Sequence, residues 1–311
     1  MNDPLRTAFD RTRRLLADPL VARIGGRAIS VAVLGGALFE LHMMDWHAIA
    51  AMVPHAPIFW AVFAVMYMTP VVADWSIYSR IWRMPVSGMQ HLLRKTIGNE
   101  LVFGYIGEAY LYTWARRSGE VGADAFRAVR DVAILSSAVG SIVTLAAALA
   151  VVPVAGKLHL AIPYWAILPS IAVILAPPIF ALVFGKRLFS LPQAVLARIV
   201  TIHGIRAALT VLLTAVLWHI ALPDIAVVYW LAFAALKLVL SRLPLISNRE
   251  LVFAGTTAAL LGRGSDVAQL MTMMAALVAA THVLAGIGLS IGDAIEAATR
   301  RTRGVLSPSA A

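Results

Sequence analysis

An apolar segment of this chain, Thr96–Arg116, is interrupted by side chains that can bind ions or take up a proton. These are an amide and two carboxylates, with a glycine beside the second carboxylate: Asn99, Glu100, Gly107 and Glu108. A carboxylate among apolar residues needs a cationic or hydrogen-bonding partner, or it takes up a proton. Glycine permits the close backbone approach that such an arrangement requires. Glu108 is therefore the strongest single candidate for chemistry, with a structural ion pair to a core arginine as the alternative.

A second apolar segment, Pro244–Gly262, is interrupted by Arg249 and Glu250, and two cations precede it at Lys237 and Arg242. Cations at membrane depth attract lipid phosphates, and basic pockets bind head groups. These three cations, with Glu250, predict a binding site for a phosphate-bearing group. Charge pairing with the carboxylates of the two segments is the alternative, and a network that is neutral at rest can open to admit an ion.

His203 and Arg206 are three residues apart, so they share one face of a helix. Either that face lines the interior of the bundle, or Arg206 extends to the membrane interface. The chain contains no H-E-x-x-H, G-x-S-x-G or Walker sequence, so we expect no metal ion, no cofactor and no catalytic residue of those classes.

The composition sets the class of protein. Of 311 residues, 60% are hydrophobic and 14% charged, whereas soluble domains contain about 45–50% apolar and about 25% charged residues. Long apolar runs separated by short charged stretches are typical of a multi-pass α-helical membrane protein. The composition excludes a disordered chain, a coiled coil and a nucleic-acid-binding domain. The net charge of +10 comes from arginines and lysines between the apolar runs, and the absence of cysteine excludes disulfides and thiolate metal sites.

The expected fold is all-α, a polytopic transmembrane bundle of seven or eight spans with two re-entrant or broken segments. The apolar runs predict spans near residues 26–44, 54–77, 131–154, 160–184, 199–221, 224–243 and 267–290. A basic cytoplasmic N-terminal segment at 1–25 precedes the membrane domain at 26–290, and a basic tail at 291–311 follows it.

Basic loops are expected on both sides of Thr96–Arg116. The loop before it carries Arg80, Arg83, Arg94 and Lys95, and the loop after it carries Arg116, Arg117, Arg127 and Arg130. Loops rich in Lys and Arg stay in the cytoplasm, so we interpret this segment as a re-entrant hairpin rather than a crossing helix. The same rule places the N-terminus in the cytoplasm, and we expect the protein to lie in the cell inner membrane. It gives no consistent side for the C-terminus, because three arginines after residue 299 favour the inside. A full crossing by Pro244–Gly262 would resolve this with eight spans.

The two interrupted segments loosely share a short pattern, Asn followed within two residues by Glu-Leu-Val-Phe and then by Gly, at 99–104 and, with Arg249 and Ala254 inserted, at 248–255. Paired broken segments in two halves are expected of transporters built from internal repeats. Because Leu, Val and Phe are common in this chain, chance is the alternative.

The sequence resembles the membrane region of the lysylphosphatidylglycerol synthase family of flippase-like proteins. In that family one segment reads Asn, three residues, Pro, x, Arg, x, Gly-Glu. Asn99, Gly107 and Glu108 match it, whereas Phe103 and Tyr105 stand at the Pro and Arg positions. A later segment reads Pro-x-Pro-Gly-Gly, then Gly, then Glu. Pro244 and Glu250 match the two ends of this family segment, but the residues between them in this chain contain no glycine pair.

The resemblance implies a bundle with broken helices that moves a lipid or a lipid-linked precursor between leaflets, without the family's soluble aminoacyl-transferring domain. A phospholipid or lipid-linked substrate and the bilayer are then the partners. The candidate substrate-binding residues are Asn99, Glu100, Gly107, Glu108, Arg206, Lys237, Arg242, Arg249 and Glu250. The alternatives are a membrane enzyme that modifies lipid head groups, with Glu108 or Glu250 as general base, and a non-catalytic scaffold for envelope biosynthesis. A homo-oligomer through small-residue faces such as Ala146–Ala150 is also left open.

Overall fold

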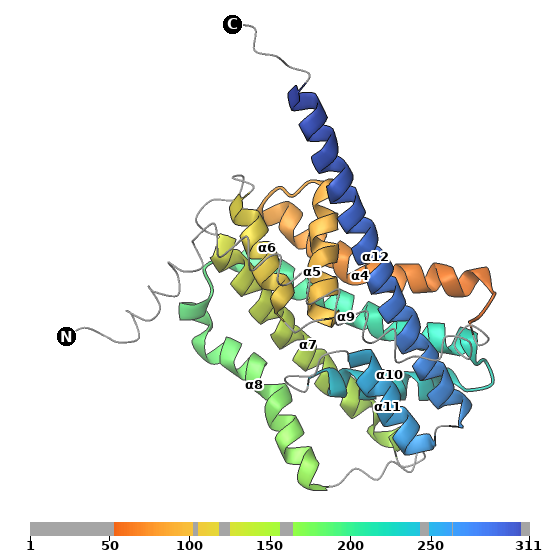
Figure 1. Cartoon of the computed structure of the whole chain (residues 1–311). Coiled ribbons are helices and arrows are strands. Elements are labelled where there is room, and N and C mark those ends of the chain that lie inside the picture. The colour runs from red at the N-terminus through yellow and green to blue at the C-terminus, as the bar shows by residue number, and fades with distance from the viewer. Residues whose placement is uncertain are drawn as a thin grey trace, which may run out of the picture.

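A computed structural model describes residues 53–101, 105–117, 125–155, 164–242, 249–262 and 264–305 (Figure 1). The chain is helical throughout these ranges, with no β-strand in them. The elements are α4 (Pro57–Ile81), the 3-10 turn η1 (Val86–Gly88), α5 (Met89–Leu101), α6 (Ile106–Arg117), α7 (Ala125–Ala155), α8 (Tyr164–Leu188), α9 (Gln193–Ala221), α10 (Val227–Ser241), α11 (Arg249–Leu261) and α12 (Asp266–Val305). The expected span at 26–44 and the basic segment at 1–25 lie outside the described residues.

Four of the described helices are long and apolar enough to cross a membrane: Pro57–Ile81, Ala125–Val151, Gln193–Ala221 and Asp266–Glu296. Ile174–Gly185 and Val227–Ser241 are shorter apolar helices. The all-helical, membrane-type architecture expected from the sequence is thus confirmed, whereas the number of seven or eight spans stays a prediction. Several boundaries differ from those expected: α7 and α9 begin earlier, at Ala125 and Gln193, and α12 continues past residue 290 to Val305.

The outward faces of the helices carry large apolar side chains. On α8, Leu182 is 83% exposed and Val183 is 69% exposed. In Figure 1, α8 lies at the edge of the bundle, and it packs against α7. Contiguous exposed apolar surface on a folded chain marks a surface that contacts lipid or another protein. This distribution agrees with helices that face hydrocarbon.

Buried apolar side chains form two main clusters at different levels of the bundle. One joins the N-terminal half of α4 to the C-terminal half of α9, with Phe63 and Trp218 among its members, and includes parts of α10, α11 and α12. The other joins the C-terminal half of α4 to the N-terminal half of α9, with Tyr78 and Ile199 among its members, and includes parts of α5, α6 and α7. Arg206, near the middle of α9, lies between the two levels.

Thr96–Arg116 forms two helices rather than one. Helix α5 ends at Leu101, α6 begins at Ile106, and Tyr105 adopts a positive φ of 77° at the turn between them. Positive φ is uncommon for a residue with a side chain, and it reverses the direction of the chain locally. The two helices pack against each other as a hairpin (Figure 1). Each contains about 20 Å of helix or less, which is shorter than a hydrocarbon layer of about 30 Å.

Helix α12 holds the hairpin against the bundle. Arg94 of α5 donates hydrogen bonds to the Asp293 carboxylate at 2.7 Å and to the Leu289 carbonyl at 3.0 Å. Ile97 and Val283 belong to a small buried apolar cluster between the same two helices. The hairpin is therefore fixed on one side by polar and apolar contacts together.

The second interrupted segment has a different structure from the first. Within it, α11 begins at Arg249 and ends at Leu261, and Gly262 follows with a positive φ of 84°, which is the usual conformation after a helix C-terminus. Leu101 of the shared pattern is the last residue of α5, whereas Leu251 lies in the first turn of α11. The described parts of the two copies therefore differ, since Glu100 and Leu101 end one helix whereas Glu250 and Leu251 begin another, and the internal repeat stays a prediction.

Candidate functional site

Two polar cavities are found between the helices of the described residues. Cavity A, of about 230 Å³, is lined by charged side chains from α4, α5, α6, α9 and α11 and from the C-terminal end of α10, with α7 contributing two serines. The charged residues are Asp74, Lys95, Glu100, Glu108, Arg206, Arg242 and Arg249. Cavity B, of about 150 Å³, is lined by the charged residues Glu100, Lys237, Arg249 and Glu250, together with Thr210, Thr214 and Ser241. Glu100 and Arg249 line both cavities, so the two are neighbours.

A buried ion triad joins α4 to the hairpin. The Lys95 ammonium lies 2.5 Å from Oδ2 of Asp74 and 3.3 Å from Oε1 of Glu108. The Asp74 side chain is 3% exposed and that of Lys95 is 11% exposed. The sequence analysis assigned Lys95 to a basic cytoplasmic loop, and this is wrong. Lys95 lies inside α5 and points inward, because two carboxylates compensate its charge there.

Asn99 links α5 to α6, because its side-chain amide both donates and accepts a hydrogen bond. Its carboxamide nitrogen donates to Glu108 at 2.9 Å and its oxygen accepts from the Gly107 backbone N–H at 2.7 Å. A Cβ atom at position 107 would overlap the Lys95 carbonyl oxygen, so only glycine permits this approach of α6 to α5. Asn99, Gly107 and Glu108, selected from the sequence, thus form one unit with Lys95.

Replacing Gly107 by alanine is expected to separate the hairpin helices and lower stability by about 1–3 kcal/mol, the usual cost of overpacking. The measurement is thermal unfolding of the purified protein in detergent. Gly255→Ala in α11 is the matched control, because a Cβ there has no neighbour within 4 Å. Equal melting temperatures for the two variants would contradict the close approach at Gly107.

Arg206 and Arg242 bring guanidinium groups to cavity A without a carboxylate partner among the described residues. Arg206 donates to the Ser136 hydroxyl at 3.1 Å, and Arg242 donates to the Thr144 hydroxyl at 3.2 Å. No carboxylate oxygen in the described part of the chain lies within 4.0 Å of either group. His203 is 1% exposed, so the face that it shares with Arg206 is interior, as one of the two sequence-based alternatives predicted.

Gly140 of α7 makes room for the Arg242 guanidinium. A Cβ at this position would lie 2.5 Å from Nη2 of Arg242 and would displace it. We expect Gly140→Ala to weaken anion binding in cavity A about tenfold, because one of two guanidiniums leaves its position and about 1.4 kcal/mol corresponds to that factor. The measurement is displacement of a fluorescent short-chain phospholipid from the purified protein.

The control for this prediction is Gly204→Ala in α9, where a Cβ meets no atom within 4 Å. That variant should bind the probe as the unmodified protein does. Equal affinity in Gly140→Ala and Gly204→Ala would show that the position of Arg242 does not matter for binding.

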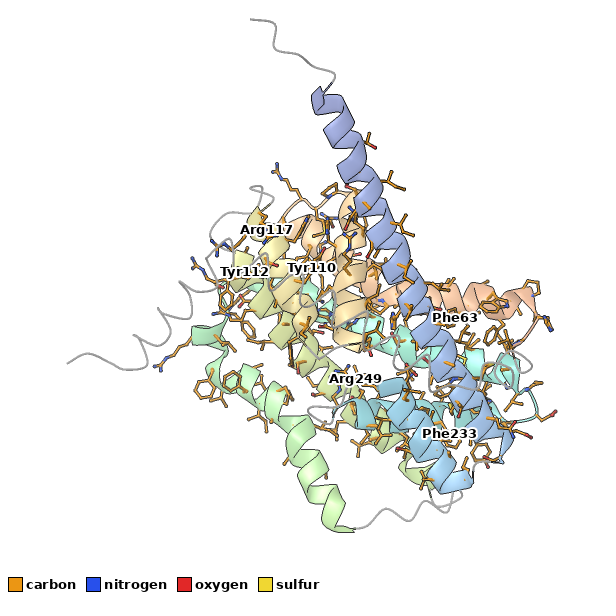
Figure 2. The ribbon with its side chains drawn as sticks, viewed as in Figure 1. Phe63, Tyr110, Tyr112, Arg117, Phe233 and Arg249 are labelled. Carbon is orange, nitrogen blue, oxygen red and sulfur yellow. The ribbon has the colours of Figure 1, made fainter. Side chains whose placement is uncertain are left out.

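Cavity B holds two further ion pairs. Lys237 lies 2.6 Å from Glu250 and over the Trp218 ring, 5.7 Å from its centroid. Arg249 lies 3.8 Å from Glu100, and both side chains are partly exposed, at 41% and 33%. Figure 2 shows Arg249 at the start of α11, between the hairpin and the α10–α11 region. The longer and more exposed Glu100–Arg249 pair is the weaker of the two.

The residues selected from the sequence thus gather in one region. Six of them line cavity A: Asn99, Glu100, Glu108, Arg206, Arg242 and Arg249. Lys237 and Glu250 line cavity B. Gly107 contacts the residues of cavity A through Asn99, because its backbone N–H donates to the Asn99 carboxamide oxygen. Glu100 and Glu108 do not share a helix face, since they lie on different helices with different partners.

Sequence reasoning missed two members of the site, Asp74 and Lys95. Asp74 lies inside the apolar run predicted as the span 54–77, and an ionisable residue within such a run is itself a signal of function. The charge of Lys95 was attributed to a cytoplasmic loop by the topology rule. That rule counts the basic residues of loops and contains no information on which side chains point into the bundle. The serine and threonine partners of Arg206 and Arg242 carry no recognisable sequence pattern.

The arrangement presents cations that can hold an anion. Glu108 accepts hydrogen bonds from Asn99 and pairs with the Lys95 ammonium, so both partners of its carboxylate come from α5. Within the described residues, no group of three or more His, Asp or Glu side chains is placed to hold a metal ion. The two arginines, by contrast, present charge-assisted donors to an anion.

Comparison with protein-family models, with curated proteins and with solved structures found no match to this chain.

Proposed function

We propose that the protein moves a phosphate-bearing lipid or lipid-linked precursor between the leaflets of a membrane. The observation that supports this function is the presence of Arg206 and Arg242 in a polar cavity, without a carboxylate partner in the described residues. Guanidinium groups bind phosphate oxygens through paired, charge-assisted hydrogen bonds. The head group would occupy cavity A while the acyl chains remain in lipid.

The position of Arg206 along α9 fits this function. Arg206 is 13 residues after Gln193 and 15 before Ala221, which places it about 20 Å along the helix from either end. If α9 crosses a hydrocarbon layer of about 30 Å, Arg206 lies near its middle, beyond easy reach of the interface. A buried cation at that depth lowers the large cost of moving a charged head group through hydrocarbon.

The Glu100–Arg249 pair provides a way to connect the two cavities. Because both residues line both cavities, separating them would join cavity A and cavity B into one polar passage. The Glu100–Arg249 pair is long at 3.8 Å and partly exposed, so separating it requires less free energy than separating the buried triad. In this mechanism the head group moves from one cavity to the other when the pair opens.

Cross-linking positions 100 and 249 is therefore expected to stop transport, because the passage cannot open. The chain contains no cysteine, so Glu100→Cys/Arg249→Cys introduces the only thiols. Bridging them with a bifunctional, cleavable thiol reagent should reduce interleaflet lipid movement in vesicles to the level of empty vesicles. Reduction of the bridge should restore movement.

The matched control is Arg94→Cys/Asp293→Cys, which replaces the 2.7 Å ion pair between α5 and α12 outside both cavities. The same bridge at this site should leave transport unchanged. Unimpaired transport with positions 100 and 249 bridged would exclude a passage between the cavities.

We further propose that the protein is a multi-pass component of the cell inner membrane with a cytoplasmic N-terminus, and that α5 and α6 enter the membrane and return on the same side. The supporting observations are four helices of spanning length and the arginines near both ends of the hairpin, with Arg83 before it and Arg116 and Arg117 in the last turn of α6. Membership of the lysylphosphatidylglycerol synthase-like group is part of the same proposal. It is supported by the clustering of Asn99, Gly107 and Glu108 at the site.

The test of this function is a lipid profile of a strain that lacks the protein, combined with a membrane-impermeant head-group label. A translocator predicts unchanged total lipid and one phosphate-bearing species with reduced labelling in the outer leaflet. Loss of a lipid altogether, with consumption of a head-group donor by the purified protein, would support the enzyme. No change in either measurement, with tolerance of substitutions at all interior charges, would support the scaffold.

A further inference from the structure

The Glu100 carboxylate is held less closely than the other carboxylates of the site. Its ion pair in the described part of the chain is the 3.8 Å contact with Arg249. The other three carboxylates have contacts of 2.5–2.9 Å to their partners: Asp74, Glu108 and Glu250. A carboxylate that is partly removed from water and has no close donor favours its protonated form. Glu100 is therefore the carboxylate of the site that takes up a proton most readily.

The charged and titratable groups around Glu100 come from each helix packed nearby. Those that act on it directly belong to α10 and α11, namely Lys237, Arg249 and Glu250. Helix α12 contributes Asp293, which pairs with Arg94 nearer the start of α5. The other groups line cavity A together with Glu100: Asp74, Lys95, Tyr105, Glu108, Arg206 and Arg242.

Arg249 is the cation whose pairing changes when Glu100 is protonated. It lines both cavities, and its carboxylate partner among the described residues is Glu100. A proton on Glu100 removes the negative charge of this partner, so the guanidinium becomes available to another anion. A phosphate oxygen of a head group then takes the place of the carboxylate, because both are acceptors for the same donor fork. The proton and the head group therefore bind together.

We propose that Glu100 is a proton-binding site and that it takes up one proton from water when a head-group phosphate binds to Arg249. This inference rests on the proposed function and adds a coupling ion to it. The proton adds to the carboxylate to give the neutral acid, and no other covalent bond changes. Return of the proton to water restores the Glu100–Arg249 pair and separates cavity A from cavity B again. Proton binding and head-group movement are thus linked at one pair of residues.

The experiment measures proton uptake during lipid binding to the purified full-length protein in detergent. The probe is short-chain phosphatidylglycerol, because its phosphodiester lacks the second ionisation of a phosphomonoester at about pH 6 and keeps a constant charge. Titration calorimetry in buffers of different ionisation enthalpy gives the number of protons taken up. We expect uptake to approach about one proton per bound lipid. The affinity should rise by up to about tenfold per unit of pH as the pH falls through the range in which Glu100 is protonated.

Two substitutions should abolish proton uptake with opposite effects on affinity. Glu100→Gln imitates the protonated carboxyl and frees Arg249, so at about pH 8 it should bind the lipid about tenfold more tightly than the unmodified protein. Arg249→Gln removes the cation that the carboxylate and the phosphate share, so it should bind about tenfold more weakly. A general disturbance of the structure would weaken binding in both variants.

The control is Asp224→Asn, which removes a carboxylate from an exposed loop outside both cavities and should retain proton uptake. Melting temperatures identify a variant that fails to fold. If Glu100→Gln fails, the proton count of the unmodified protein and its loss in Arg249→Gln still decide.

The outcomes separate this inference from the function on which it rests. Lipid binding without proton uptake, or proton uptake that persists in folded Glu100→Gln, would overturn the assignment of Glu100 while leaving lipid transport intact. If the lipid binds at no pH, and no phosphate-bearing lipid is transported by the unmodified protein, both the function and the proton site are excluded.

Discussion

Replacing Arg206 and Arg242 together by glutamine is expected to lower the rate of interleaflet lipid movement about 100-fold or more. Each charge-assisted hydrogen bond contributes about 1.5–3 kcal/mol, so the loss of two corresponds to at least that factor. The effect should be large because the two groups are the cations of cavity A without a carboxylate partner in the described part of the chain. The measurement is the rate at which a fluorescent phospholipid becomes accessible to an impermeant quencher in vesicles.

Two control variants show whether a loss of lipid movement comes from the loss of these two guanidinium groups. Arg206→Lys/Arg242→Lys keeps both charges but not the planar donor fork, so it should retain part of the activity. Arg198→Gln removes an arginine from the exposed face of α9 and should leave transport unchanged. Full activity in the double glutamine variant, at normal protein levels, would exclude these arginines from the transport path.

Replacing Lys95 by methionine is expected to destabilise the protein by about 3–5 kcal/mol, because removing one partner of a buried ion pair leaves the other charge uncompensated. Here two carboxylates lose their shared cation, and the Asp74 side chain is only 3% exposed. The measurement is equilibrium unfolding in detergent. A second substitution, Asp74→Asn, should recover a large part of the loss, since it removes one of the two unpaired charges.

Arg187→Met is the comparison for a cation on an exposed position of α8 and should change stability by less than about 0.5 kcal/mol. If Lys95→Met were as stable as this variant, the ammonium would not be a buried member of the triad. Failure of Asp74→Asn to recover stability would mean that the cost comes from packing rather than from charge.

The helical class of the fold follows from hydropathy alone, whereas the ends of the helices do not. Helix α7 begins at Ala125, and its first two turns contain Arg127, Arg130 and Asp131. A search for apolar runs excludes such a turn. In the structure Asp131 is fully buried and accepts hydrogen bonds from the backbone N–H groups of Ser190 and Leu191. The helix is thus extended by a tertiary contact between residues about 60 positions apart.

The candidate site was predictable only in the part that depends on local sequence and not in the part that depends on tertiary contacts. Asn99 and Glu108 stand out because amides and carboxylates are rare inside apolar segments, and local spacing placed a glycine beside them. Their partner Lys95 could not be identified, since its pairing with Asp74 depends on the packing of α5 against α4. Likewise, only the fold shows that Lys237 is neutralised by Glu250 while Arg242 faces a hydroxyl group.

The most direct test of the central claim is the rate of interleaflet movement of a phosphodiester lipid in vesicles that contain only the purified protein. The account predicts faster movement than in empty vesicles, and no acceleration for an uncharged glycolipid with the same acyl chains, because the two arginines recognise the phosphate. Equal rates with and without the protein, or equal acceleration of both lipids, would contradict a phosphate-binding transport site.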